Sequence, residues 1–200
     1  MKNKNLLMKR IGAYLIDTII ISIIIEMLIQ IPFLKPNEKK YNSINENLEK
    51  IIVNFENDEI SLNDFKNEYI VINYNLLKLE NKINICRICL VFLYFVILQW
   101  KFNGQTIGKK LFKIKVVSNT DNELSFTNCF FRALLINNLF LYIMLLFGRY
   151  YLNDVSNYYL ALSINVIRNT ILYCSAILIL FRKDARGLHD LIVKTKVIEA

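Results

Sequence analysis

Long apolar runs alternate with polar segments along this chain, and the pattern predicts four membrane-spanning helices. The runs cover residues 11–34, 83–100, 129–147 and 158–181. Each is close to the roughly 20 residues that a helix needs to cross about 30 Å of hydrocarbon at about 1.5 Å per residue. We therefore expect an all-α integral membrane bundle in which residues 1–200 form a single membrane domain.

Two of the runs carry signals of their own. Pro32 should end the first helix near its outer face, because proline cannot continue a helix. The first run is too long for a signal peptide and no small-residue cleavage site follows it, so we expect an uncleaved helix. Asn165, Arg168 and Asn169 interrupt the fourth run with polar groups.

Residues 35–82 form a polar insertion between the first two runs. "SINE" at 43–46 and "SLND" at 61–64 are capping-box patterns, which predict two short amphipathic helices. The stretch "YIVINYN" at 69–75 could equally form a strand. The insertion could be a polar spacer or a module that binds a partner protein.

The segment 101–128 has a different pattern. "FKIKVV" and "ELSF" flank the turn-rich stretch "SNTDN". Two short runs around such a turn predict a small β-hairpin. We expect this hairpin-like loop to lie at the inner membrane surface.

Charge gives the expected orientation. The chain is 54% hydrophobic yet has a net charge of +8, and its cations lie in short segments beside the apolar runs. A nucleic-acid partner would need a basic soluble face instead, so we expect the lipid bilayer as the partner and no nucleic acid. Lys and Arg concentrate before the first run, in 101–128 and after residue 181, whereas 35–82 has seven lysines and nine acids. Because basic segments stay inside, we expect a multi-pass protein of the cell membrane with both termini cytoplasmic and 35–82 outside.

Five charged residues fall inside the predicted spans: Asp17, Glu26, Arg87, Arg132 and Arg168. Such residues usually face the bundle interior and have partners. Asp17 and Glu26 are nine residues apart, which at about 100° per residue puts them on opposite faces, so they belong to two sites. Depth predicts that Asp17 meets Arg132 in the inner leaflet and that Glu26 forms an outer-leaflet ion pair with Arg87. Arg168 has no acid at its depth.

These acids have two interpretations. A carboxylate could alternate between an arginine-paired and a protonated state along an ion or proton path. Alternatively, static ion pairs could fix the packing of the helices. Both interpretations stay open for Asp17, whereas packing is favoured for Glu26 and Arg87.

Several motifs occur together and in order: "RIGAYLID" at 10–17, "GQTIGKKLFKIKVV" at 104–117, Arg132, and "DARGLHDLIVKTKV" at 184–197. In these motifs the chain resembles the RDD family of membrane proteins, named after one arginine and two aspartates. Arg10 and Asp17 match the first two, and Asp190 matches the third. The 35–82 insertion and the wide gap between Arg132 and the last motif depart from the family pattern.

The resemblance implies a small integral membrane protein of a kind often suggested to transport something. It also implies one polar cluster at the cytoplasmic mouth of the bundle, where Gly104 and Gly108 would allow tight turns. Asp190 would bind Arg10 or Lys109 there. The expected cluster consists of Arg10, Asp17, Thr106, Lys109, Arg132 and Asp190.

Other chemical signals are weaker. "GQTIGKK" has three residues between its glycines and no Ser or Thr after its lysine, so it is not an ATP-binding loop. His189 is the only histidine and cannot make a zinc site, so we expect a structural hydrogen bond there and no metal or cofactor. Cys86 and Cys89 form C-x-x-C near the outer end of the second span, as in membrane thiol oxidoreductases, but cysteines at this helical spacing are commonly packing residues.

The expected function is therefore transport or transport support, with a cation or a proton as a candidate cargo, and not an enzyme activity. The alternative is a membrane scaffold whose 35–82 insertion binds an unknown protein. A thiol oxidoreductase that uses Cys86 and Cys89 is a remote alternative. A transporter this small would need to form a homo-oligomer to enclose a path.

Overall fold

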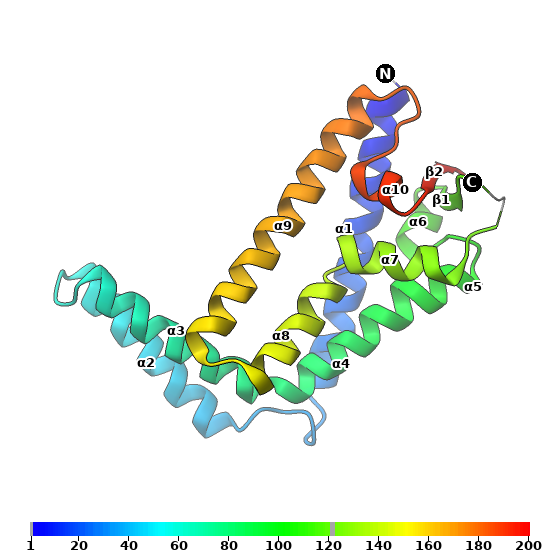
Figure 1. Cartoon of the computed structure of the whole chain (residues 1–200). Coiled ribbons are helices and arrows are strands. Elements are labelled where there is room, and N and C mark those ends of the chain that lie inside the picture. Colours follow the sequence, from blue (N-terminus) through cyan, green and yellow to red (C-terminus); the bar gives the residue numbers. More distant parts are fainter. Residues whose placement is uncertain (1, 121–122) are drawn as a thin grey trace.

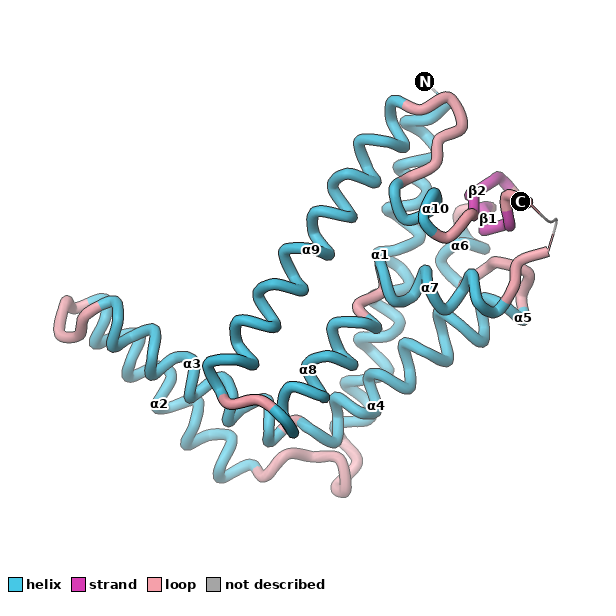
Figure 2. Tube along the Cα trace, in the orientation of Figure 1, coloured by secondary structure: helices cyan, strands magenta, loops and turns pink. Residues whose placement is uncertain are grey.

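The computed structural model describes residues 2–120 and 123–200, with side chains from Lys4 onward, and it is mostly helical (Figure 1). Two short strands, β1 (Ile114–Ser118) and β2 (Thr195–Glu199), form the described sheet (Figure 2). This confirms the expected all-α class with one small β element. The helices are α1 (Lys2–Ile29), α2 (Glu38–Glu56), α3 (Leu62–Leu79), α4 (Asn81–Phe92), the π-helix η1 (Leu93–Leu98), α5 (Gln99–Lys101), α6 (Ile107–Leu111), α7 (Phe126–Ile136), α8 (Leu139–Tyr151), α9 (Asp154–Phe181) and α10 (Leu188–Ile192).

Membrane-length helices dominate the fold. Among the described residues, three helical stretches are long and apolar enough to cross a membrane: Lys4–Ile29, Asn81–Lys101 and Asp154–Phe181. The second of these joins α4, η1 and α5 end to end. The bent pair α7–α8 would make a fourth span. These are the helices of a multi-pass membrane protein.

Two span boundaries differ from those expected. Helix α1 ends at Ile29 rather than near residue 34. Pro32 explains the early end, because proline disfavours helical backbone at the residue before it. Helix α9 starts earlier than residue 158, because Asn153 caps it by accepting a 2.8 Å hydrogen bond from the Ser156 amide.

The third apolar run is not one straight helix. Helices α7 and α8 are bent by 69° at a break that contains Asn137 and Asn138. Asn138 has a φ of 61°, a left-handed conformation that asparagine tolerates better than most residues. The Asn138 Oδ1 atom is buried without a hydrogen-bond partner. A break in the helix therefore replaces the continuous span expected over 129–147.

The insertion 35–82 is a helical hairpin made of α2 and α3 (Figure 1). Ser61 caps α3, as "SLND" predicts, by accepting a 3.2 Å hydrogen bond from the Asp64 amide. The helix start predicted from "SINE" is wrong, because Asn37 caps α2 and Ser43 lies inside that helix. The strand considered for "YIVINYN" is also wrong, since this stretch lies within α3.

The strand in "FKIKVV" was expected, but its partner was not. Strand β1 pairs antiparallel with β2 near the C-terminus, from Ile114 opposite Glu199 to Ser118 opposite Thr195. Val116 and Val197 face each other in this sheet and are both buried, which favours the pairing. "ELSF" is not a strand, because its serine, Ser125, caps α7 through a capping box with Asn128.

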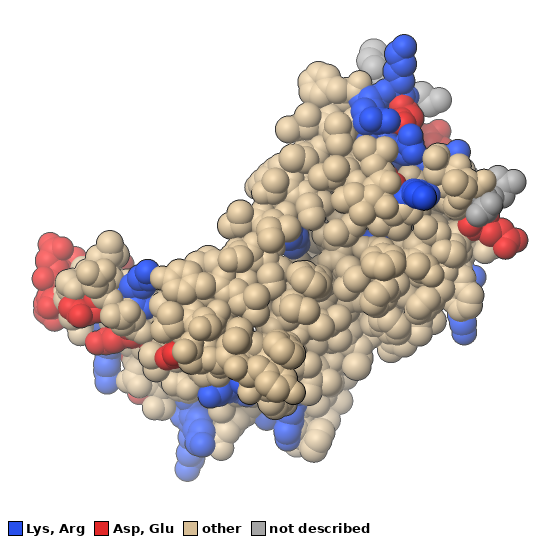
Figure 3. All heavy atoms as spheres, viewed as in Figure 1, with Lys and Arg blue, Asp and Glu red and all other residues tan. Residues whose placement is uncertain are grey.

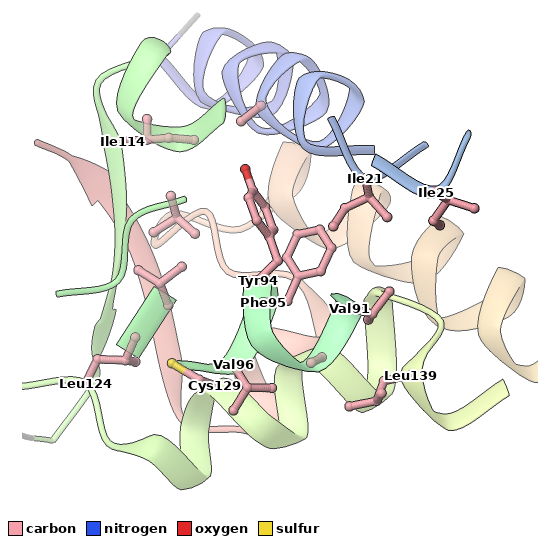
Figure 4. Close-up of a cluster of buried hydrophobic side chains, with 14 of the residues drawn as sticks. Ile21, Ile25, Val91, Tyr94, Phe95, Val96, Ile114, Leu124, Cys129 and Leu139 are labelled. Carbon is pink, nitrogen blue, oxygen red and sulfur yellow. The ribbon is translucent and has the colours of Figure 1, made fainter. Parts of the chain in front are cut away.

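The main apolar core lies between α1, α4–η1 and α7. Figure 4 shows Ile21 and Ile25 of α1 facing Val91 and Phe95 across this interface. Helix α9 takes less part in the core, because 17% of its apolar stretch is buried, against 39% for Asn81–Lys101. Most residues of the α9 apolar stretch are therefore exposed or half-buried.

Charged side chains gather at the two ends of the bundle. On the face shown in Figure 3, Lys, Arg, Asp and Glu are almost absent from the surface between these ends. We call one end the polar end: it holds both termini, α6, α10 and the sheet (Figure 1). The other is the hairpin end, where α1 ends and the chain continues into α2 and α3. An almost uncharged face of this kind suits a membrane-embedded surface.

Candidate functional site

Asp190 is the centre of the polar end. Its carboxylate is fully buried and lies between two arginines. Arg10 of α1 donates from Nη1 to Oδ2 over 2.7 Å, and Arg132 of α7 donates from Nη1 to Oδ1. The Gly187 amide adds a 3.1 Å hydrogen bond to Oδ2. Burial raises the pKa of Asp190, but Arg132 and Arg10 outweigh it and hold this pKa well below its usual range, so Asp190 is ionised.

These contacts join distant parts of the chain. Arg10 also donates to the Ala185 carbonyl over 3.0 Å, which fixes the segment that leads into α10. Arg132 also donates to Thr195 Oγ1 over 2.6 Å, which ties α7 to the first residue of β2. The C-terminal segment is thereby attached to both α1 and α7.

His189 attaches the same segment to α9. Its Nδ1 lies 2.8 Å from Ser175 Oγ, and its Nε2 lies 3.4 Å from Asp190 Oδ1. Burial lowers the pKa of His189 to about 4, although the neighbouring Asp190 acts in the opposite direction. The ring is therefore neutral near pH 7 and has the structural hydrogen bond expected from the sequence.

Asp17 is buried on the same helix as Arg10, about two turns away. Its Oδ1 accepts hydrogen bonds from the Tyr94 hydroxyl at 2.5 Å and from the Gly108 amide at 2.8 Å. Its Oδ2 accepts one from Thr106 Oγ1 at 2.6 Å. Figure 4 shows the Tyr94 side chain rising from η1 with its hydroxyl pointing towards α1. Three uncharged donors therefore bind this carboxylate.

The short helix α6 can approach Asp17 because residue 108 is glycine. A Cβ at Gly108 would collide with the Ala13 carbonyl of α1 and would lie 2.8 Å from Asp17 Oδ1. Thr106 caps α6 and so holds the Gly108 amide in place. Gly104 has a φ of 87° and makes the tight turn expected there, whereas Gly108 serves close packing rather than a turn.

Lys109 is close enough to Asp17 and Asp190 to interact with the charges of both. Its Nζ donates to Gln99 Oε1 over 2.6 Å. Burial, and then the nearby Arg132, lower the pKa of Lys109 to about 8. Most Lys109 side chains are therefore charged at pH 7, although the hydrogen-bond acceptor that the structure describes for Lys109, Gln99 Oε1, is neutral.

The polar cluster expected from the sequence is assembled, but its pairing differs. Contact between Asp190 and Arg10 is confirmed. The expected partnership of Asp17 with Arg132 is wrong, because Arg132 binds Asp190 instead. Hydroxyl and amide donors already occupy both oxygens of Asp17, so no arginine is needed to satisfy them.

The outer-leaflet ion pair is also wrong. Arg87 donates to Asn84 Oδ1 over 2.8 Å and lies over the Tyr142 ring, whereas Glu26 is exposed on α1. No ion pair joins Glu26 and Arg87 in the described part of the chain. Within the described part of the chain, Arg168 makes only a 3.3 Å hydrogen bond to Asn169 Oδ1 and a 3.5 Å hydrogen bond to the Tyr14 hydroxyl, and its Nε is buried without a partner.

Several residues of the site were not predicted. Tyr94, Gln99, Ser175 and Thr195 all supply hydrogen bonds within it. They carry no charge, so a search for charged residues in apolar runs passes over them. A tyrosine hydroxyl inside an apolar span was the available signal, because a buried tyrosine hydroxyl usually needs a partner.

Two cavities lie beside α1. The polar-end cavity has a volume of about 270 Å³, and Arg10, Asp17, Lys109 and Arg132 are among its lining residues. The hairpin-end cavity has a volume of about 240 Å³ and is lined in part by Ser22, Glu26, Arg87 and Asn138. Three residues line both cavities: Tyr14, Phe95 and Asn137.

The remaining candidates from the sequence are metal ligands and cysteines. Within residues 2–120 and 123–200, no group of three or more His, Cys, Asp or Glu could hold a metal ion. Cys86, Cys89, Cys129 and Cys174 are all free thiols. Cys89 is exposed and Cys86 half-buried, one helical turn apart on α4.

Membrane-length helices, an almost uncharged face between the two ends and a buried charged cluster at one end define a multi-pass α-helical membrane protein. The RDD family model matches residues 5–194, essentially the whole chain, so the protein belongs to the RDD family. The match includes the α2–α3 hairpin, although that insertion departs from the motif pattern. No curated protein and no solved structure matches the chain.

Proposed function

We propose that this protein moves a small charged solute across the membrane through the two cavities beside α1. The observation that carries the proposal is their arrangement in series, with Tyr14, Phe95 and Asn137 between them. Alternating access requires a solute site that is closed to one face at a time. A few side chains between two cavities can provide such a barrier.

The length of the two cavities matches the thickness of a bilayer. The polar-end cavity begins at Leu7 of α1, and the hairpin-end cavity extends to Glu26 of the same helix. Nineteen residues of helix rise about 28 Å, close to the roughly 30 Å of the hydrocarbon core. The pair of cavities would therefore cover most of the membrane.

The break between α7 and α8 lies at the barrier. Asn137 lines both cavities, and Asn138 lines the hairpin-end cavity with its Oδ1 buried and unpartnered. Interrupted helices near the midplane form the solute sites of many transporters, because their free polar groups can face the path. Asn138 could accept a hydrogen bond from a passing solute or water.

The charges around the polar-end cavity indicate which kind of solute it would accept. Arg10, Lys109 and Arg132 outnumber Asp17 and Asp190, and hydrogen bonds or ion pairs already occupy both carboxylates. A free metal cation would meet repulsion and find no open carboxylate ligand. An anion therefore suits this cavity better than the cation considered from the sequence, and the proton considered there stays a candidate.

We place the polar end in the cytoplasm and the hairpin end outside the cell membrane. The support is the Lys and Arg content of the N-terminus, the 101–128 loop and the C-terminal tail. The large exposed apolar side chains on α9, such as Val166, Tyr173 and Ile177, would face lipid or a second copy of the chain. A homo-oligomer would enclose the path more fully.

The second candidate function is a scaffold, and the α2–α3 hairpin favours it. The hairpin extends away from the spans (Figure 1) and is held together by stacking of Phe55 on Phe65, whose centroids are 4.6 Å apart. Its connecting region carries Glu56, Asp58 and Glu59 with no nearby cation in sequence. A partner protein outside the membrane would meet this acidic tip.

Flux into proteoliposomes tests transport directly. The purified chain is reconstituted, and uptake of protons, K⁺, Na⁺ and a small carboxylate is compared with empty vesicles. Ser22 lines the hairpin-end cavity, so Ser22→Phe should fill it and reduce flux at least several-fold. Ile23→Phe is the matched control, because Ile23 is the next residue and is exposed on the outer surface of α1.

The result expected is flux of at least one solute that Ser22→Phe lowers and Ile23→Phe does not. Absence of flux for the whole panel in correctly inserted protein would contradict transport. Equal flux through the Ser22→Phe variant and the natural chain would show that the solute does not pass through the hairpin-end cavity.

A further inference from the structure

The polar-end cavity has an excess of positive charge. Arg10, Lys109 and Arg132 line it, against one lining carboxylate, Asp17. Asp190 does not line the cavity, but it forms ion pairs with Arg10 and Arg132 and so compensates one further positive charge. His189 is neutral near pH 7. Three cations face two carboxylates, which leaves one uncompensated positive charge beside the cavity.

Some donors around the cavity are unused. The Arg10 Nε is buried and has no hydrogen-bond partner in the part of the chain that the structure describes. Lys109 has three ammonium hydrogens, but among the described residues Gln99 Oε1 is the only acceptor with which it forms a hydrogen bond. A buried cation that lacks an anionic partner is costly, so a bound anion would stabilise this arrangement.

Most of the remaining lining of the cavity is apolar. Leu7 and Ile11 of α1 and Leu172, Ala176 and Ile179 of α9 form its walls. Ile11 is 43% exposed, so this wall reaches the outer surface of the bundle, where lipid would lie. A ligand could therefore place a charged head among the cations and an apolar tail between α1 and α9.

We propose that this cavity binds a single-chain amphipathic anion, such as a fatty-acid carboxylate, with its headgroup at Lys109 and its chain between α1 and α9. The volume of about 270 Å³ lies near the lower limit of small-molecule sites, about 300 Å³. It suits one acyl chain better than a two-chain phospholipid. The inference rests on the proposed function only in treating this cavity as the working site, because binding can be measured without transport.

Photolabelling tests the proposal. The full chain in phosphatidylcholine nanodiscs is labelled with a decanoate that carries a diazirine, and the modified peptides are identified by mass spectrometry. Label should appear on α1 and α9, and unmodified decanoate should compete with it. Decanol, which has the same chain without the charge, should not.

Two matched pairs of variants locate the site. Lys109→Gln should reduce labelling roughly tenfold, the loss expected for one hydrogen bond to a charged group, whereas Lys110→Gln on the exposed side should not. Ala176→Leu should block the chain-binding part, whereas Ile177→Leu, at an exposed position, should leave labelling unchanged. Thermal unfolding of each variant shows whether it is folded. If the Lys109→Gln variant does not fold, the Ala176→Leu and Ile177→Leu variants still test the binding site.

Three results would overturn the inference. Equal competition by decanol would show an apolar pocket without anion selectivity. Competition by acetate as strong as by decanoate would show a headgroup site without a chain site. Loss of labelling in phosphatidylglycerol nanodiscs, with no competition by decanoate, would assign the cavity to a two-chain lipid. Absence of flux alongside specific labelling would refute transport and leave the binding site standing.

Discussion

The guanidinium of Arg10 donates a 2.7 Å hydrogen bond to the carboxylate of Asp190, although these residues are 180 positions apart in the chain. Arg132 holds the other oxygen of the same carboxylate. One aspartate therefore connects the first helix, the broken helix and the C-terminal segment. Its removal would leave the buried Arg132 and the half-buried Arg10 without their counter-charge.

Asp190→Asn should lower the free energy of unfolding by roughly 3–5 kcal/mol, because breaking a buried ion pair leaves an uncompensated charge. Denaturation in detergent micelles measures this. Asp184→Asn is the control, since Asp184 pairs with Arg182 and Arg186 at the surface, where such pairs contribute roughly 0–1 kcal/mol. Equal losses in the two variants would show that the buried pairs do not hold the segment.

Tyr94→Phe should destabilise the protein by roughly 1.5–3 kcal/mol, the range for a hydrogen bond to a charged group. The reason is the 2.5 Å bond from the Tyr94 hydroxyl to Asp17. In a double-mutant cycle with Asp17→Asn, the two losses should fall short of additive, because both variants weaken the same contact. Strictly additive losses would show that the two side chains do not interact.

Gly108→Ala should disrupt the Asp17 site, because the added methyl group would collide with the α1 backbone at Ala13. We expect a lower melting temperature and loss of any flux. Ile107→Ala is the control, since Ile107 is the adjacent residue and is 46% exposed. A Gly108 variant that melts like its control would refute the close approach of α6 to α1.

Stability should fall as the pH falls from about 6.5 to about 4. The folded pKa of His189 is about 4, below its usual 6.5, so the unfolded chain binds more protons in this window. Asp190 acts to raise this pKa, while Arg132, Arg10 and Lys109 act with burial to lower it. The loss should approach about 3 kcal/mol at most, at about 1.4 kcal/mol per pH unit.

The variant His189→Gln isolates the histidine contribution. Melting temperatures at pH 7.5 and pH 4.5 should differ more for the natural chain than for this variant. The same pH dependence in both proteins would show that His189 is already charged in the folded state.

The sequence predicted the helices better than their contacts. Apolar runs of membrane length are local features, so the spans were visible, and the Ser61 cap of α3 was read correctly. The pairing of β1 with β2 could not be predicted, because Ser118 and Thr195 lie far apart in the sequence. The nearer stretch "ELSF" fitted the same local pattern. Local patterns indicate a strand but do not identify its partner.

The charged members of the polar cluster could be predicted, because they too are local features of the sequence. Their pairing could not be predicted. Charged residues in apolar runs stand out, which singled out Asp17 and Arg132. The donors to Asp17 are a tyrosine, a threonine and a backbone amide, none of which differs in charge from its surroundings. Which of two acids an arginine binds depends on helix positions that depth alone does not fix.

The central claim is that two water-accessible cavities lie in series beside α1, and thiol accessibility tests it most directly. Ser22→Cys and Ala176→Cys, in a chain without its four native cysteines, place one thiol in each cavity. Ile23→Cys and Ile177→Cys place thiols on the neighbouring outward-facing positions. A charged, membrane-impermeant methanethiosulfonate should modify Ser22→Cys only from the hairpin side and Ala176→Cys only from the side of the termini, and both faster than their neighbours. Cavity thiols that react no faster than the outward-facing ones, or that react from the same side, would contradict the account.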